Sequence, residues 1–122
     1  MKPLQTFAAL LIASVLLASS ASAQQSDGFA KGNEEYAAGK FREAIELYDG
    51  VVRDGQLSAA LFYNLGNAWY RAEDLGRAIL NYERALALQP RHPEALANLR
   101  LVRDKARALE LRQTSAERLF AH

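Results

Sequence analysis

The feature that most constrains this chain is a pattern of large and small residues between positions 62 and 90. It consists of Phe62, Leu65-Gly66, Trp69, Ala78, Tyr82, Ala85 and Pro90. Gly66 and Ala78 are small enough to let two helices approach closely, the large residues fill the space around them, and Pro90 ends the second helix. The pattern therefore predicts a tightly packed helical hairpin.

The same pattern occurs once more, 34 residues earlier. The shift superposes six pairs, namely Gly32 on Gly66, Asn33 on Asn67, Tyr36 on Tyr70, Ala44 on Ala78, Ile45 on Ile79 and Tyr48 on Tyr82. We expect helices over 27–38 and 41–53 in the first hairpin, with a turn at Gly39-Lys40 and a stop at Asp54-Gly55. In the second hairpin we expect helices over 58–72 and 75–88, with Ser58 as N-cap.

A third unit begins after Pro93 and then departs from the pattern. Leu96 and Leu99 repeat Phe62 and Leu65, but Arg100 stands where the close-packing glycine is expected. Helical spacing of apolar residues continues without a turn signal, so we expect one long helix over 93–112 that covers the end of the second hairpin. Residues 113–122 are expected to form a short last helix or a tail, because Thr114-Ser115-Ala116-Glu117 has the sequence of a capping box.

The first 23 residues have the three zones of a secretory signal peptide. Lys2 precedes an apolar run over 7–18, and a small polar stretch ends in Ala21-Ser22-Ala23. An apolar run of about 12 residues is short against the roughly 20 that span a bilayer. We therefore expect cleavage after Ala23 and a periplasmic or secreted protein, with membrane attachment only if the segment is retained. The chain contains no cysteine, which excludes disulfides and a lipid-modified N-terminal cysteine.

Charge is balanced in total but unevenly placed. Without the signal segment the basic and acidic residues are equal in number, which argues against a nucleic-acid partner. Residues 24–58 carry 4 basic and 7 acidic side chains, whereas residues 91–122 carry 7 and 4. Two interpretations stay open: solvated helix faces, or attraction between the unlike ends of two copies.

The 34-residue pattern resembles the tetratricopeptide repeat (TPR). The resemblance implies an all-α fold, a short right-handed α-solenoid with one repeat over 24–58, one over 59–92, and a capping helix or partial third repeat over 93–112. It also implies a concave groove, lined by the first helix of each repeat, that binds another protein or a peptide. The positions expected to face it are Phe29, Asn33, Tyr36, Tyr63, Asn64, Asn67, Tyr70, Arg71, Asn98, Leu101 and Lys105.

These groove positions are rich in amides and aromatic rings. Asparagine can satisfy both the N–H and the C=O of an extended peptide, and tyrosine adds rigid contact area with a polar tip. The alternative is that the asparagines bond helix to helix within the framework. TPR domains that grip a C-terminal carboxylate use a lysine in the first repeat, where this chain has Phe29, and a cation in the third, where it has Glu94 and Asn98. A receptor for carboxylate tails is therefore not expected.

Catalysis, cofactors and metals are not expected. The two histidines, His92 and His122, have no acid or nucleophile fixed beside them in the sequence. Glu34 and Glu35 are adjacent on a helix and so point about 100° apart, which makes them a solvated edge rather than a carboxylate pair.

Several longer stretches are similar to the TPR proteins of the Bat (Bacteroides aerotolerance) systems. They are Gly32-Asn33-Glu34-Glu35-Tyr36, residues 60–68 and residues 75–86, within a likeness that covers about 29–103. The resemblance implies an exported envelope protein that assists the assembly of von Willebrand factor A-type proteins. The sequence thus predicts a periplasmic TPR adaptor, and the alternatives are a self-associating structural unit or a shortened form of a longer membrane-anchored protein.

Overall fold

Five helices stacked from one end of the molecule to the other make up the described structure. A computed structural model describes residues 27–121, and within this range every regular element is an α-helix. The helices are α2 (Asp27–Ala37), α3 (Phe41–Arg53), α4 (Ala59–Arg71), α5 (Leu75–Leu88) and α6 (Pro93–Phe120). The expected signal segment over 1–23 lies outside the described residues. No helix in residues 27–121 is both long and apolar enough to cross a bilayer.

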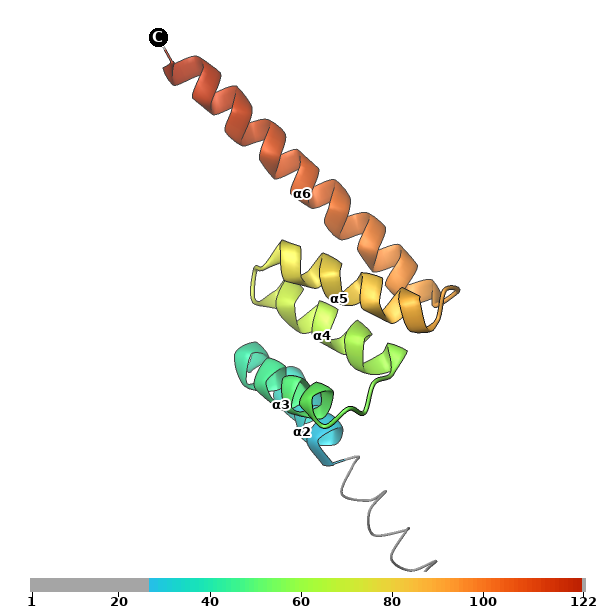
Figure 1. Cartoon of the computed structure of the whole chain (residues 1–122). Coiled ribbons are helices and arrows are strands. Elements are labelled where there is room, and N and C mark those ends of the chain that lie inside the picture. The colour runs from blue at the N-terminus through green and yellow to red at the C-terminus, as the bar shows by residue number, and fades with distance from the viewer. Residues whose placement is uncertain (1–26, 122) are drawn as a thin grey trace, which may run out of the picture.

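Two helical hairpins and one long helix form three successive layers. In Figure 1, α2 and α3 lie at one end, α4 and α5 in the middle, and α6 at the other end. The predicted all-α repeat fold is confirmed, with helix ends within a residue or two of those expected.

Local signals in the sequence set these helix ends. Gly39 and Gly55 adopt left-handed backbone conformations, with φ of 78° and 77°, which glycine reaches without steric cost. The Ser58 hydroxyl accepts a hydrogen bond from the Leu61 N–H at 3.1 Å, so Ser58 is the N-cap of α4 as predicted. Asp74 caps α5 in the same way, through the Arg77 N–H at 2.9 Å.

Close approach within each hairpin depends on a glycine facing a tyrosine. A Cβ added at Gly66 would lie 2.6 Å from the Tyr82 ring, and one added at Gly32 would collide with the Tyr48 ring. Tyr48 and Tyr82 are only 1% exposed. The repeated glycine therefore sets how closely the two helices pack, as its spacing predicted.

The core is continuous from the first hairpin to α6. Ile45, Tyr48 and Val51 of α3 pack with Leu61 and Leu65 of α4 in one cluster. A second cluster joins Ala78 and Tyr82 of α5 to Leu99 and Val102 of α6. The expected stripe of α6 thus covers the end of the second hairpin.

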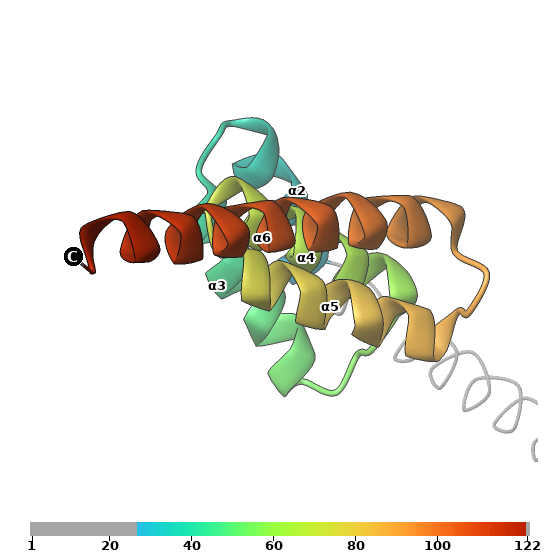
Figure 2. The ribbon, with the colours of Figure 1, turned by 90° about the horizontal axis from the view of Figure 1, so that it is seen from above.

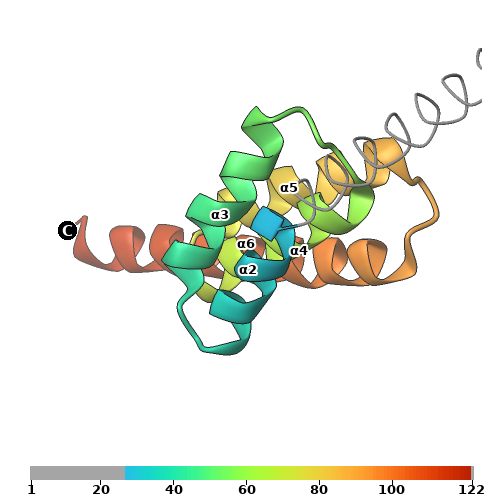
Figure 3. The same cartoon turned by 90° about the horizontal axis from the view of Figure 1, so that it is seen from below.

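The end of α6 differs from the expectation. Residues 113–120 continue the same helix rather than begin a new one after a break at 112. The Thr114 and Ser115 hydroxyls donate to the Leu111 carbonyl one turn earlier, at 3.0 and 2.8 Å, so they stay inside the helix instead of capping a new one. From residue 107 onward every described residue is exposed, and this part of α6 projects beyond the α4–α5 turn (Figures 2 and 3). It does not fold back onto the repeats.

Candidate functional site

The predicted groove is present as two adjoining hollows along the first helices. The first has a volume of about 230 Å³ and is lined by Asn33, Tyr36, Tyr48, Asn64 and Asn67. The second has a volume of about 270 Å³ and is lined by Tyr36, Asn67, Tyr70, Arg71, Tyr82, Asn98, Leu101 and Val102. Because Tyr36 and Asn67 line both, the hollows form one surface across α2, α4 and α6, which we call the groove.

Eight of the residues predicted for the groove line it, and three lie elsewhere. Phe29 packs beside the Tyr48 ring, with ring centres 6.0 Å apart. Tyr63 is half-buried between Tyr82 and His92, at 6.1 and 5.1 Å. Phe29 and Tyr63 therefore support the hairpins from within. Lys105 lies just beyond the second hollow, with its Nζ 3.3 Å from the Tyr70 hydroxyl.

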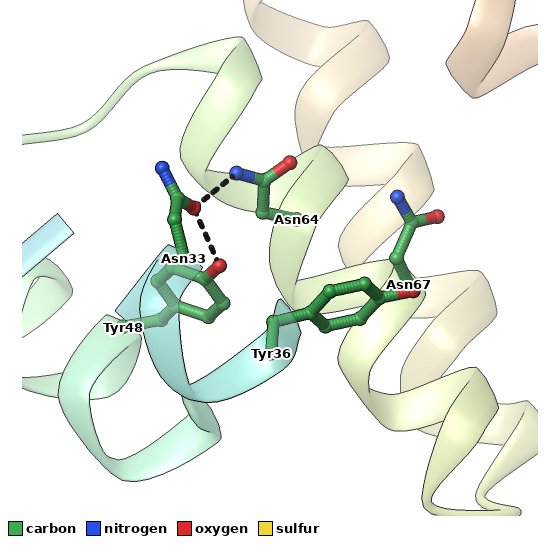
Figure 4. A pocket seen from close by; sticks show the side chains of 5 residues that line it. All are labelled: Asn33, Tyr36, Tyr48, Asn64 and Asn67. Carbon is green, nitrogen blue, oxygen red and sulfur yellow. Dashed lines mark hydrogen bonds between the residues drawn. The ribbon is translucent and has the colours of Figure 1, made fainter. Parts of the chain in front are cut away.

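A hydrogen-bonded network built on Asn33 shapes the first hollow (Figure 4). The Asn33 Oδ1 accepts from the Tyr48 hydroxyl at 2.6 Å and from the Asn64 Nδ2 at 2.9 Å. These three residues come from α2, α3 and α4. The network thus joins both helices of the first hairpin to the first helix of the second.

An equivalent network lies one repeat later. The Asn67 Oδ1 accepts from the Tyr82 hydroxyl at 2.6 Å and from the Asn98 Nδ2 at 3.1 Å. It joins α4, α5 and α6. Each step of the stack is therefore fixed at the groove by the same polar device, which supports the interpretation of these asparagines as framework residues.

Framework bonding does not use up the amides. In the described part of the chain, no protein group bonds the Nδ2 of Asn33 or Asn67, or the Oδ1 of Asn64 or Asn98. Each network therefore offers one free donor and one free acceptor, the two groups that a peptide unit requires. Both interpretations of the asparagines hold: one end of each amide builds the framework, and the other is available to a ligand.

Tyr48 and Tyr82 are groove residues that the sequence analysis did not predict. They come from the second helices, where the pattern calls for a core aromatic, and only the hydroxyl reaches the groove. Burial raises the pKa of Tyr48 to about 12 and also raises the pKa of Tyr82. Both hydroxyls therefore remain protonated donors at neutral pH. Their recurrence at the 34-residue offset was the available signal.

The charge of the groove is neutral to positive. No acidic side chain lines either hollow. Arg71 is held over the Phe41 ring at 4.5 Å, and Lys105 over the Tyr70 ring at 4.9 Å. Both cations lie toward the α6 end, so an acidic residue of a ligand would be attracted there.

The structure gives His92 a structural position. Its Nδ1 accepts from the Ala95 N–H at 3.1 Å, so it caps the start of α6 while its ring packs beside Tyr63. Within residues 27–121, no group of three or more His, Asp or Glu side chains is placed to hold a metal ion.

Comparison with known proteins agrees with this geometry. A tetratricopeptide repeat family model matches residues 29–93. The chain is similar to human "Tetratricopeptide repeat protein 16", at 28% identity over 87 residues, which cover 71% of this chain and 10% of that protein. It is also similar to the protein of the same name from Macaca fascicularis, at 30% identity over 70 residues, which cover 57% of this chain and 8% of that protein.

Repeats of this kind mediate contacts between proteins, and the chain spans about a tenth of the length of these relatives. The model covers more than half of the residues, both hairpins have the glycine–tyrosine packing expected, and the groove lies on the first helices. The chain belongs to the tetratricopeptide repeat family.

Proposed function

We propose that this protein is a TPR adaptor that binds an extended segment of another protein in the groove. The observation that carries the proposal is the pair of free amide groups at each network, Asn33 with Asn64 and Asn67 with Asn98. A donor and an acceptor repeated from one TPR to the next suit a peptide backbone, which presents the same two groups at regular intervals.

The bound segment is uncharged or acidic in this proposal. The groove contains amides, tyrosine hydroxyls and Leu101, and its cations are Arg71 and the neighbouring Lys105. A basic segment would gain no ion pair there and would approach two like charges. Leu101, which is 58% exposed, supplies apolar contact for a side chain of the segment.

Selection from a display library of random unstructured peptides tests the proposal. The selected peptides should bind the wild-type chain and lose about tenfold or more in affinity to Leu101→Asp, which places a carboxylate in the groove. Leu80→Asp is the matched control, because Leu80 is 43% exposed on α5 and does not line the groove. Equal loss in both variants, or in neither, contradicts the groove as the binding surface.

The proposed place of action is the bacterial periplasm. The support is the sequence of residues 1–23, with Lys2, the apolar run over 7–18 and the small residues ending at Ala23. When the full sequence is expressed in a bacterium that exports proteins, the purified chain should begin at Gln24. An N-terminus at Met1 on a chain that remains in the cytoplasm contradicts export.

The resemblance over residues 29–103 supports a role in assembling a von Willebrand factor A-type envelope protein. In this role the groove holds a segment of that protein. Mixing the purified chain with such a protein should give a complex that Leu101→Asp weakens and Leu80→Asp does not. A complex that resists Leu101→Asp contradicts the use of the groove, and no complex contradicts the partner.

A further inference from the structure

The two ends of the helical stack differ in the residues they expose. In α4, Leu61, Leu65 and Ala68 are buried against the preceding hairpin. The equivalent positions in α2, 34 residues earlier, are Asp27, Lys31 and Glu34, and all three are exposed. The first hairpin therefore presents a charged outer face instead of an apolar one.

Small residues lie beside these charges. Ala30, Ala37 and Ala38 are exposed on α2 or at its end. Asp27 pairs with Lys31 at 3.1 Å, whereas Glu34 has no ion-pair partner within residues 27–121. We call Asp27, Ala30, Lys31, Glu34 and Ala37 the head face. It is a face of low relief that carries one free acidic side chain.

The opposite end exposes the side of α6 that a hairpin partner would cover. In α4, Phe62 and Gly66 pack against α5, and α6 has Leu96 and Arg100 at the equivalent positions. A hollow of about 250 Å³ there is lined by α6 alone, through Leu96, Leu99, Arg100, Arg103, Asp104 and Arg107. We call these residues the tail face.

The charges of the tail face are mainly basic and partly free. Arg103 pairs with Glu83 of α5. Arg100 and Arg107 have no ion-pair partner in the described part of the chain. Leu96, at 43% exposed, adds an apolar contact between them. An acidic surface with small residues is therefore the complement that this face lacks.

We propose that the tail face of one copy docks on the head face of another, so that copies of this chain associate head to tail. Arg100 and Arg107 then surround Glu34, and the alanines of α2 let α6 approach closely. The two faces differ, so the contact is heterologous and adds further copies without closing. Neither face lines the groove, so the proposal stands independently of peptide binding.

Sedimentation velocity of the full chain, exported so that any processing of its N-terminus occurs, tests the proposal. At low salt the average size should rise with protein concentration, and added salt should reverse the rise because it screens the contact. A monomer at all concentrations and at low salt overturns the proposal.

Charge reversal on each face identifies the contact. Arg100→Glu and Glu34→Arg should each raise the concentration needed for association by roughly tenfold or more. An equimolar mixture of the two variants should associate again, since each retains the face that the other has lost. This recovery also shows that both variants fold.

Arg112→Glu is the matched control, because it reverses a charge on the exposed part of α6 outside the tail face. It should associate as the wild type does. Association of the Arg100→Glu or Glu34→Arg variant at wild-type concentration overturns the proposal, and so does a mixture of the two that stays monomeric.

Discussion

The two hairpins of this protein have the same packing and differ in their turns. The turn between α2 and α3 is Gly39-Lys40, and the turn between α4 and α5 is Glu73-Asp74, at positions 34 residues apart. Gly39 and Glu73 both adopt a left-handed backbone, with φ of 78° and 65°. Only the glycine does so without steric cost.

The caps show the opposite preference. Asp74 caps α5 through its side chain, whereas Lys40 makes no side-chain cap bond to α3. The first hairpin thus has the unstrained turn and the uncapped helix, and the second has the strained turn and the capped helix. One backbone path is compatible with either solution, because the glycine–tyrosine contact and the asparagine network hold both hairpins in the same shape.

The largest effect is expected from overpacking the glycine of either hairpin. Gly66→Leu and Gly32→Leu should each lower the free energy of unfolding by roughly 1–3 kcal/mol, because the new side chain displaces the facing tyrosine. Gly66→Leu should cost more, since the second hairpin is packed between α3 and α6 and has less room to yield. Urea denaturation measures both.

Gly76→Ala is the control for the glycine substitutions. A Cβ at Gly76 would lie 3.8 Å from its nearest listed neighbour atom, Oδ1 of Asp74, which is ordinary contact. In the helix this substitution should be neutral or stabilising by about 0.5–1 kcal/mol. A Gly66→Leu variant as stable as the wild type contradicts the packing described for the hairpins.

Exchanging the turn residues should alter the hairpins in opposite directions. Gly39→Glu should destabilise the first hairpin by about 1–2 kcal/mol, because glutamate is strained at this φ. Glu73→Gly should relieve that strain and stabilise the second hairpin, by less than the same amount because glycine gains freedom in the unfolded chain. Thermal unfolding of the single and double variants gives the comparison, and equal signs for the two changes would refute it.

Removing a tyrosine hydroxyl should have a smaller effect. Tyr48→Phe and Tyr82→Phe should each cost about 0.5–1.5 kcal/mol, because each leaves the Asn33 or Asn67 carbonyl with one hydrogen bond instead of two. Urea denaturation at neutral pH measures the loss. If both variants match the wild type, the networks do not hold the repeats together.

Alkaline pH tests the same hydroxyl through its proton. The pKa of Tyr48 is about 12 in the folded chain against an ordinary value of 10.0, so the folded state holds the proton more tightly. The stability that this shift contributes is complete below pH 10 and is lost as pH rises toward 12. Urea midpoints measured between about pH 9 and about pH 11 should fall less steeply for Tyr48→Phe than for the wild type.

The smallest effect is expected where neither hairpin is touched. Ending the chain at Ala108 removes only residues that are exposed in the described structure. The free energy of unfolding should change by no more than about 0.5 kcal/mol, while the helical signal falls in proportion to the residues lost. A loss of several times this amount would show that the end of α6 packs on the repeats.

The helix ends were predictable wherever a residue allows only one outcome. Gly39, Gly55 and Ser58 stop or start helices by backbone freedom or capping, and the sequence analysis placed them correctly. Thr114 and Ser115 do not have a single outcome, because a hydroxyl can cap a new helix or bond back to the previous turn. Only the continuous helix of the structure decides between these.

The groove was predictable from register but not in its bonding. Positions on the first helices follow from helical periodicity, so Asn33, Tyr36 and Asn67 were found. Tyr48 and Tyr82 were not, because a tyrosine in a core position reads as an aromatic filler until its hydroxyl is seen to reach an asparagine. Long-range polar contacts of this kind need the relative placement of three helices.

The most direct test of the groove follows the asparagine side chains by NMR while a selected peptide is added. Binding in the groove should shift the side-chain amide signals of Asn33, Asn64, Asn67 and Asn98, since their free donors and acceptors meet the peptide backbone. The signals of Asn81, whose Nδ2 bonds the Arg77 carbonyl at 2.9 Å within α5, should stay in place. Shifts confined to the outer helices α3 and α5, or to the projecting end of α6, would contradict the groove as the binding surface.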